Sequence, residues 1–200
     1  MPLRRSGAHR RPACYRRRMM RERQQDSPHE RAADRTGGGS GLFPPAGHDH
    51  RACAADTLAR AEATCRRHGL TLSPGRRRVL EALAVSHAPV GAYDIIERLA
   101  ASGPRPAPIT VYRALSFLTE NALAHRIERL NAFVACTRPH DGARPLVFLI
   151  CESCRQVGEL EADAVGIDLE RTCAGSGFRP HSAALEIVGL CRRCAAAAGP

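Results

Sequence analysis

Residues 109–118 read ITVYRALSFL, a run in which apolar residues recur with the period of an amphipathic helix. One side of that helix carries Val111, Ala114, Leu115 and Leu118. The opposite side carries Thr110, Arg113 and Phe117. The run therefore predicts a helix that buries one face and turns an arginine outward.

Three further helices are expected ahead of this one. The first spans about residues 56–68, with Asp56 as its capping residue and a glycine as its stop. The second spans about 73–86 and begins with Ser-Pro, a capping residue followed by proline at the first helical position. The third spans about 91–101, and the proline-rich segment 103–108 ends it.

Two short alternating segments follow the run, at 123–130 and 132–136, and they meet at Asn131. This pattern is typical of a β-hairpin. Successive helices, an exposed arginine on the last of them and then a hairpin predict a winged helix over residues 53–136. In such a module the last helix enters the major groove of DNA, where Arg113 can bond bidentately to guanine.

The distribution of charge agrees with that interpretation. All thirty basic residues are arginine, and the net charge is +10. Residues 1–52 hold 12 arginines against 5 acids, residues 53–130 hold 11 against 7, and residues 131–200 hold 7 against 8. The middle segment can therefore face nucleic acid, whereas charge alone gives the last segment no such role.

Two Cys-x-x-Cys pairs stand in the last segment, Cys151/Cys154 and Cys191/Cys194, with 36 residues between them. Each pair follows an apolar, strand-like run, so two strands would each deliver two thiolates to one ion. Four thiolates with no open position are typical of a structural zinc site.

Residues 146–200 are predicted to form a small α/β unit for dimerisation, joined to the winged helix by a hinge loop at 137–145. Its strands are expected around 146–150, 156–161 and 184–190, with a helix at about 163–174. The predicted fold class is thus α+β, with an N-terminal winged-helix DNA-binding domain followed by a small α/β dimerisation domain. The dimerisation domain is expected to contain a structural zinc site formed by the four cysteines.

The first 52 residues are rich in Arg, Pro and Gly and lack apolar periodicity. We expect a disordered extension, or a chain whose true start lies at Met19, Met20 or a later codon. No apolar export segment precedes the cysteines, and no run approaches the ~20 apolar residues needed to span a bilayer. These observations predict a cytoplasmic protein without a membrane role.

The chain resembles the ferric uptake regulator (Fur) family, and within it the zinc-responsive members. The resemblance covers about residues 56–195 and rests on Ala92-Tyr-Asp94, on the Thr-Val-Tyr-Arg-Ala-Leu motif at 110–115 and on the two cysteine pairs. It implies a homodimeric transcriptional repressor of zinc-uptake genes on a palindromic operator, with zinc as corepressor. It also implies that bases are contacted through Tyr93 and Arg113, with Thr110 and Tyr112 in the same motif.

The resemblance implies two zinc ions per subunit, one structural and one regulatory. Candidate regulatory ligands are placed so as to bridge the hinge: His125, Cys136, His140 and Glu159. The relatives carry a histidine at the position of Arg144, so His140, four residues earlier, is the expected substitute. A thiolate among nitrogen and oxygen ligands favours zinc over ferrous iron.

Alternatives remain at this stage. Within the family, the rivals are sensors of iron or peroxide, and outside it a zinc-ribbon adaptor that binds only protein. A deaminase-like enzyme would need His-x-Glu ahead of its Cys-x-x-Cys, and this chain has none. A Cys136/His140 nucleophilic pair lacks a glycine-rich loop to accompany it, so no enzyme activity is expected.

Overall fold

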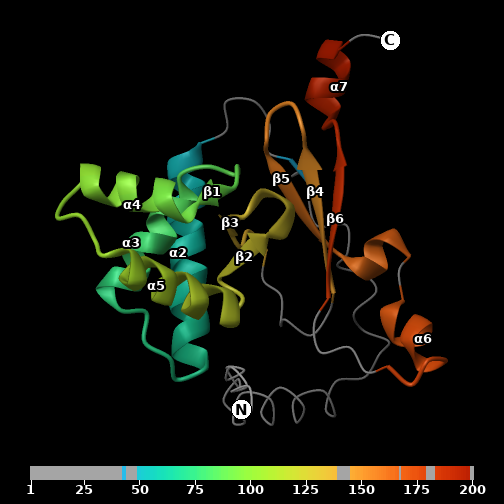
Figure 1. Cartoon of the computed structure of the whole chain (residues 1–200), viewed down its shortest axis with the longest axis horizontal. Helices are drawn as coiled ribbons and strands as arrows, with labels where there is room; N and C mark the ends of the chain where they lie inside the picture. Colours follow the sequence, from blue (N-terminus) through green and yellow to red (C-terminus); the bar gives the residue numbers. More distant parts are fainter. Residues whose placement is uncertain (1–41, 44–48, 139–144, 167, 179–182, 199–200) are drawn as a thin grey trace, which may run out of the picture. The chain divides into compact units, whose positions relative to one another are not determined.

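A computed structural model describes residues 42–43, 49–138, 145–166, 168–178 and 183–198 (Figure 1). Most of the N-terminal extension, the loop residues His140 and Arg144, and His181 lie outside these ranges. None of the helices in the described ranges is long and apolar enough to cross a membrane.

Four helices open the described part of the chain: α2 (His50–Arg67), α3 (Pro74–Ala84), α4 (Ala92–Ala101) and α5 (Pro108–Glu120). The predicted cap of α3 is confirmed, because the Ser73 side chain accepts from the Arg76 N–H with Pro74 at the first helical position. The buried face of α5 is also as predicted, namely Val111, Ala114, Leu115 and Leu118.

Helix α2 begins seven residues earlier than predicted. Asp49 caps it in place of Asp56, with its Oδ1 accepting from the N–H groups of Arg51 at 2.8 Å and Ala52 at 3.3 Å. Residues 49–52 therefore belong to the first helix and its cap, and not to a disordered extension.

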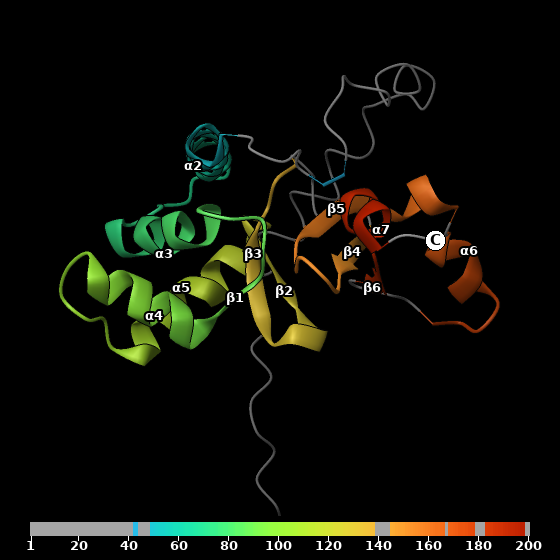
Figure 2. The same ribbon diagram turned by 90° about the horizontal axis from the view of Figure 1, so that it is seen from above.

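A three-stranded sheet closes the winged helix: β1 (Val90–Gly91), β2 (Ala124–Ile127) and β3 (Ala132–Ala135), in the order β1-β3-β2. The hairpin turns through a short 3-10 helix at Glu128–Leu130 and through Asn131, whose φ of 45° lies in the left-handed region that asparagine tolerates. Figures 1 and 2 show α3, α4 and α5 on one side of this sheet. The predicted winged helix is confirmed, and the two-residue strand β1 was not anticipated.

The second sheet consists of β4 (Leu146–Cys151), β5 (Val157–Glu161) and β6 (Ala184–Gly189), in the order β5-β4-β6. Strand β4 pairs antiparallel with β5 and parallel with β6. A parallel pair needs a crossover, which here contains a 3-10 turn at Ala162–Val165 and α6 (Leu169–Ala174). The single helix predicted at 163–174 is wrong in extent, because Gly166, with φ of 73°, ends the first turn. A last helix, α7, spans Arg192–Ala198.

The two sheets share an apolar cluster. Ile127 and Val134 of the winged helix pack in it with Leu146, Phe148, Ile150 and Val157 of the second sheet. Within β4, Phe148 pairs with Glu159 on β5 and with Glu186 on β6. These three residues therefore form one row across the second sheet.

Candidate metal centres and recognition helix

The four cysteines of the two pairs come together at one end of the second sheet. Cys151 ends β4 and is in register with Gly189 of β6, two residues before Cys191. All four Sγ atoms lie within 4.8 Å of one another, and the Sγ atoms of Cys154 and Cys191 are 3.8 Å apart. Thiolates at about 2.3 Å from a tetrahedral zinc are separated by about 3.8 Å, so the geometry fits this ion.

The thiols of this centre do not all ionise with equal ease. Burial opposes ionisation of Cys151, but N–H groups of Cys154, Cys191 and Ser153 donate to its sulfur and lower its pKa to about 6. The N–H of Cys191 lies 3.4 Å from that sulfur. Burial, by contrast, raises the pKa of Cys154 to about 11. A cation that binds all four sulfurs must therefore displace a thiol proton from Cys154.

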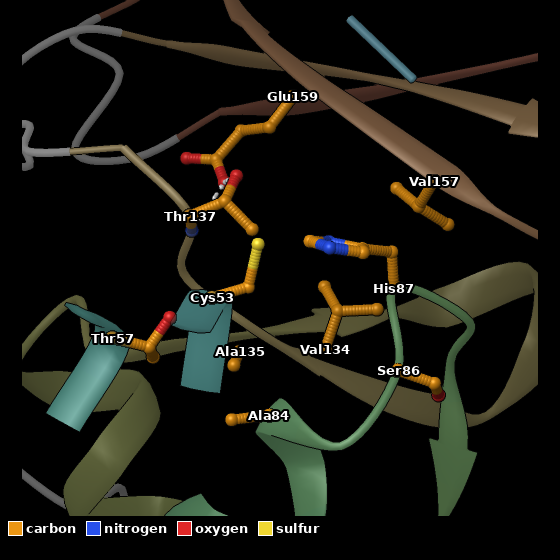
Figure 3. Close-up of a pocket in the computed structure, with 10 residues that line it drawn as sticks. All are labelled: Cys53, Thr57, Ala84, Ser86, His87, Val134, Ala135, Thr137, Val157 and Glu159. Atoms are coloured by element: carbon orange, nitrogen blue, oxygen red, sulfur yellow. Dashed lines mark hydrogen bonds between the residues drawn. The ribbon is translucent and has the colours of Figure 1, made fainter. Parts of the chain in front are cut away.

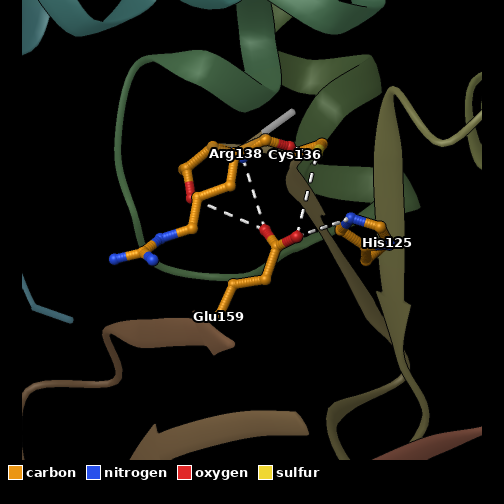
Figure 4. A network of polar contacts seen from close by, with 5 residues as sticks. His125, Cys136, Arg138 and Glu159 are labelled. Atoms are coloured by element: carbon orange, nitrogen blue, oxygen red, sulfur yellow. Dashed lines mark hydrogen bonds and ion pairs between the residues drawn. The ribbon is translucent and has the colours of Figure 1, made fainter. Parts of the chain in front are cut away.

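A second cluster joins the winged helix to the second sheet. His125 lies on β2 and Cys136 directly follows β3, whereas Glu159 lies on β5. Glu159 Oε1 is 3.3 Å from His125 Nε2 and 3.7 Å from Cys136 Sγ, as Figure 4 shows. The three potential ligand atoms lie within 4.8 Å of one another. His140, the fourth predicted ligand, falls outside the described residues.

The surroundings of this cluster orient its groups. Thr137 donates to the other oxygen, Glu159 Oε2, through its N–H at 3.4 Å and its hydroxyl at 3.5 Å. These bonds orient the carboxylate so that Oε1 points toward His125 and Cys136. Such a second interaction is typical of metal-binding carboxylates, where it fixes the ligand's direction.

The burial of the cluster argues for a cation. Glu159 is only 6% exposed and Cys136 only 9%. Burial, and next the charge of Glu159, raises the pKa of the Cys136 thiol well above its usual range. A buried carboxylate facing a thiol is costly unless a positive charge compensates it, and a bound metal ion that displaces the thiol proton would do so.

A cavity adjoins this cluster from the side of α2 (Figure 3). It is lined by Cys53 and Thr57 of α2, by His87 ahead of β1, and by Thr137 and Glu159 among others. His125 and Cys136 are not among its lining residues. The cavity therefore gives access to Glu159 from α2 without being the ligand cluster itself.

The predicted DNA-contacting residues lie on the surface. Tyr93 is 68% exposed and Tyr112 43% exposed, and Thr110 and Arg113 are also exposed. The first turn of α5 contains no acidic residue. Phe117, predicted on the outer face, is half-buried beneath the Arg76 guanidinium, which lies 3.5 Å from the ring centre. The polar face of α5 therefore consists of Thr110, Tyr112, Arg113 and Ser116, with the exposed aliphatic Ile109 beside them.

Sequence reasoning missed two residues that these contacts involve. Thr137 was assigned only to the hinge loop, although a hydroxyl next to a ligand cysteine is a usable signal for an orienting partner. Glu186 was taken as an ordinary position of β6. Its carboxylate accepts from the N–H groups of Glu128 and Arg129, 58 and 57 residues earlier, and no local pattern indicates such a pairing.

A winged helix, a four-thiol centre and a mixed His/Cys/Glu cluster between two sheets define a metal-binding protein of the winged-helix class. The chain belongs to the ferric uptake regulator family, whose profile matches residues 67–188. The zinc uptake regulation protein of Escherichia coli (strain K12) is 32% identical over 139 residues, which make up 70% of this chain and 81% of that protein.

Two solved structures share the arrangement. A zinc uptake regulator complexed with zinc and DNA matches with a TM-score of 0.65 and 31% identity, over 74% of this chain and 98% of that chain. The crystal structure of holo XcZur matches with a TM-score of 0.64 and 40% identity, over 70% of this chain and 98% of that chain. The family and the fold class expected from the sequence are thus confirmed.

Proposed function

We propose that this chain is a zinc-responsive repressor of zinc-uptake genes, with zinc as corepressor. The observation that carries the proposal is the cluster of His125, Cys136 and Glu159, which links the winged helix to the second sheet. The names of the relatives, a zinc uptake regulation protein and a zinc uptake regulator complexed with zinc and DNA, support it.

In this proposal the two metal sites have different tasks. Cys151, Cys154, Cys191 and Cys194 hold structural zinc, and the cluster of His125, Cys136 and Glu159, with His140 as fourth ligand, holds regulatory zinc. Zinc supplies positive charge to the buried ligands of the regulatory site. Because these ligands come from both sheets, filling the site favours the arrangement in which they converge. Metal binding and DNA binding then share one coupling free energy, typically ~1–3 kcal/mol.

The exposed face of α5 reads DNA in this proposal. Arg113 donates two hydrogen bonds to a guanine edge, and Tyr93, Thr110 and Tyr112 contact the neighbouring bases or backbone. Residues 53–136, together with the cap and first turn of α2 at 49–52, serve as the DNA-binding domain, 137–145 as the hinge and 146–200 as the dimerisation domain. A homodimer would present two recognition helices to a palindromic operator in the cytoplasm, with no enzymatic step.

Cys136 decides between this function and the alternatives. A sensor of iron or peroxide in the same family would use harder nitrogen and oxygen ligands, whereas a buried thiol in direct reach of a histidine and a carboxylate suits zinc. An adaptor that binds only protein would leave the exposed Arg113 and Tyr93 without a task.

The experiment that tests the function is a zinc titration of DNA binding. Protein stripped of loosely held metal is mixed with promoter DNA of a zinc-uptake gene, and the retarded fraction is followed as free zinc rises. Binding that rises with zinc, and not with ferrous iron at matched free concentration, supports the proposal. Binding independent of both metals contradicts it.

Arg113→Ala is expected to reduce discrimination between operator and random DNA by roughly 10–100-fold, because a bidentate arginine–guanine pair contributes about 1–3 kcal/mol. Zinc content should remain unchanged, since Arg113 lies on the exposed face of α5. Competition binding on both DNAs measures the ratio, with Arg171→Ala on α6 as the matched loss of an exposed arginine. An Arg113→Ala variant that keeps the wild-type ratio would refute the assigned role.

A further inference from the structure

Two carboxylates lie in one row on the second sheet. Glu159 and Glu186 are both in register with Phe148 of β4, one on each neighbouring strand. Residues in register on adjacent strands point to the same face of a sheet. Both carboxylates contact the winged helix, so that shared face is the one turned toward it.

Strand β2 of the winged helix crosses this row from one carboxylate to the other. His125 at its start meets Glu159, and its ring centre lies 5.2 Å from that of Phe148. Ile127 at its end packs in the same apolar cluster as Phe148. Immediately beyond it, the N–H groups of Glu128 and Arg129 donate to Glu186 Oε1 at 2.6 Å and Oε2 at 3.1 Å.

The separation of Glu159 and Glu186 on the second sheet matches the separation of their partners along strand β2. Two strand separations, from β5 over β4 to β6, amount to about 10 Å. Three residues of extended chain, from His125 to Glu128, also span about 10 Å. Glu159 and Glu186 therefore bind the two ends of strand β2, and neither the strand nor the second sheet has to distort for both contacts to form.

We propose that Glu186 is a positioning residue that sets the zinc affinity of the regulatory site, an inference that rests on the proposed function. Glu159 and the Val157 N–H, which donates to the His87 carbonyl at 3.1 Å, attach the winged helix to β5. With both of these contacts at one edge of the sheet, and an apolar cluster without directional contacts beyond them, β2 can still pivot about β5. The second attachment at Glu186 fixes the direction of β2. It therefore holds His125, and Cys136 directly after the paired strand β3, where zinc needs them.

Zinc is the probe, and the readout is its affinity for the second site, measured by competition with a chromogenic zinc chelator. Glu186→Ala removes both hydrogen bonds, and we expect a loss of about ten-fold, or about 1.4 kcal/mol. Glu186→Asp keeps the negative charge but withdraws the carboxylate by one methylene, so it should lose affinity to a similar extent. Both variants should still retain the zinc of the four-cysteine site.

Asp168→Ala is the matched control. Asp168 is likewise an acid of the second half that accepts a backbone hydrogen bond, from the Arg171 N–H at 2.9 Å, but it is exposed and this bond caps α6 instead of joining the winged helix. It can lower thermal stability, yet it should leave zinc affinity at the wild-type value.

The outcomes separate the inference from the proposed function. A Glu186→Asp variant with wild-type affinity would show that only charge matters and would overturn the positioning role. So would unchanged affinity in Glu186→Ala beside a wild type that binds two zinc ions. A wild type that takes up no second zinc ion overturns the proposed function instead.

Discussion

Cys191→Ser is expected to lose the structural zinc and, with it, the folded second sheet or the dimer. The Cys191 Sγ lies 3.8 Å from that of Cys154, and its N–H donates to Cys151, so this residue ties the end of β6 to the end of β4. A serine hydroxyl does not replace a thiolate ligand at neutral pH.

The size of the effect follows from the small core of this sheet. Besides the cluster that it shares with the winged helix, its apolar cluster among the described residues has three buried members, Val147, Leu160 and Ala162. Structural zinc in small zinc-binding peptides contributes about 10–16 kcal/mol. That value is as large as the whole stability of a typical domain, about 5–15 kcal/mol.

Thermal unfolding by circular dichroism, zinc content by elemental analysis and sedimentation for the oligomeric state measure the loss. Cys173→Ser is the matched control, because Cys173 on α6 belongs to neither of the two ligand clusters found among the described residues. A Cys191→Ser dimer with the melting temperature and zinc content of the control would contradict the structural role.

Cys136→Ser is expected to abolish the second zinc site while leaving the first intact. Wild type should keep one zinc ion per subunit after mild chelation and regain a second when zinc is restored. The variant should stay at one, because its remaining described ligands are His125 and Glu159. Loss of even an outer-shell partner typically costs about 10–100-fold in metal affinity, so loss of the thiolate should cost at least about 100-fold, and zinc should no longer enhance DNA binding.

Elemental analysis before and after chelation checks this prediction, again with Cys173→Ser as control. Serine nearly matches cysteine in volume, so the core around position 136 should stay folded. If wild type and variant both hold one zinc ion throughout, the four cysteines are the metal site in use and the signal that controls this protein lies elsewhere.

The helices that could be predicted are those with a strong apolar stripe or an unambiguous cap. Ser73-Pro74 located α3, and the spacing from Val111 to Leu118 located the buried face of α5. The start of α2 could not be placed, because Asp49 and Asp56 are both suitable caps and the buried positions between them and the helix end are Thr57, Ala61 and Cys65. Such small or polar residues give almost no apolar signal.

The site was predictable to the extent that its chemistry is written in residue type and spacing. The two Cys-x-x-Cys pairs indicate a zinc site from local sequence alone. The resemblance to the family indicated His125, Cys136 and Glu159, and the structure places their potential ligand atoms within 4.8 Å of one another. The Glu186 contact depends on the parallel pairing of β4 and β6 across a crossover, a long-range choice that no sequence window contains. Predicted ligand status for His140 remains a prediction.

The proposed regulatory ligands are divided between two sheets, so the time at which a copy of the protein releases zinc should depend on whether that copy is bound to DNA. Coupling acts equally in both directions, so any factor by which zinc tightens DNA binding is also the factor by which DNA tightens zinc binding. Copies free in solution would surrender zinc to a chelator first, and copies seated on an operator last. A cell entering zinc shortage would thus empty its unoccupied pool before derepression begins, which delays the response to brief dips in supply.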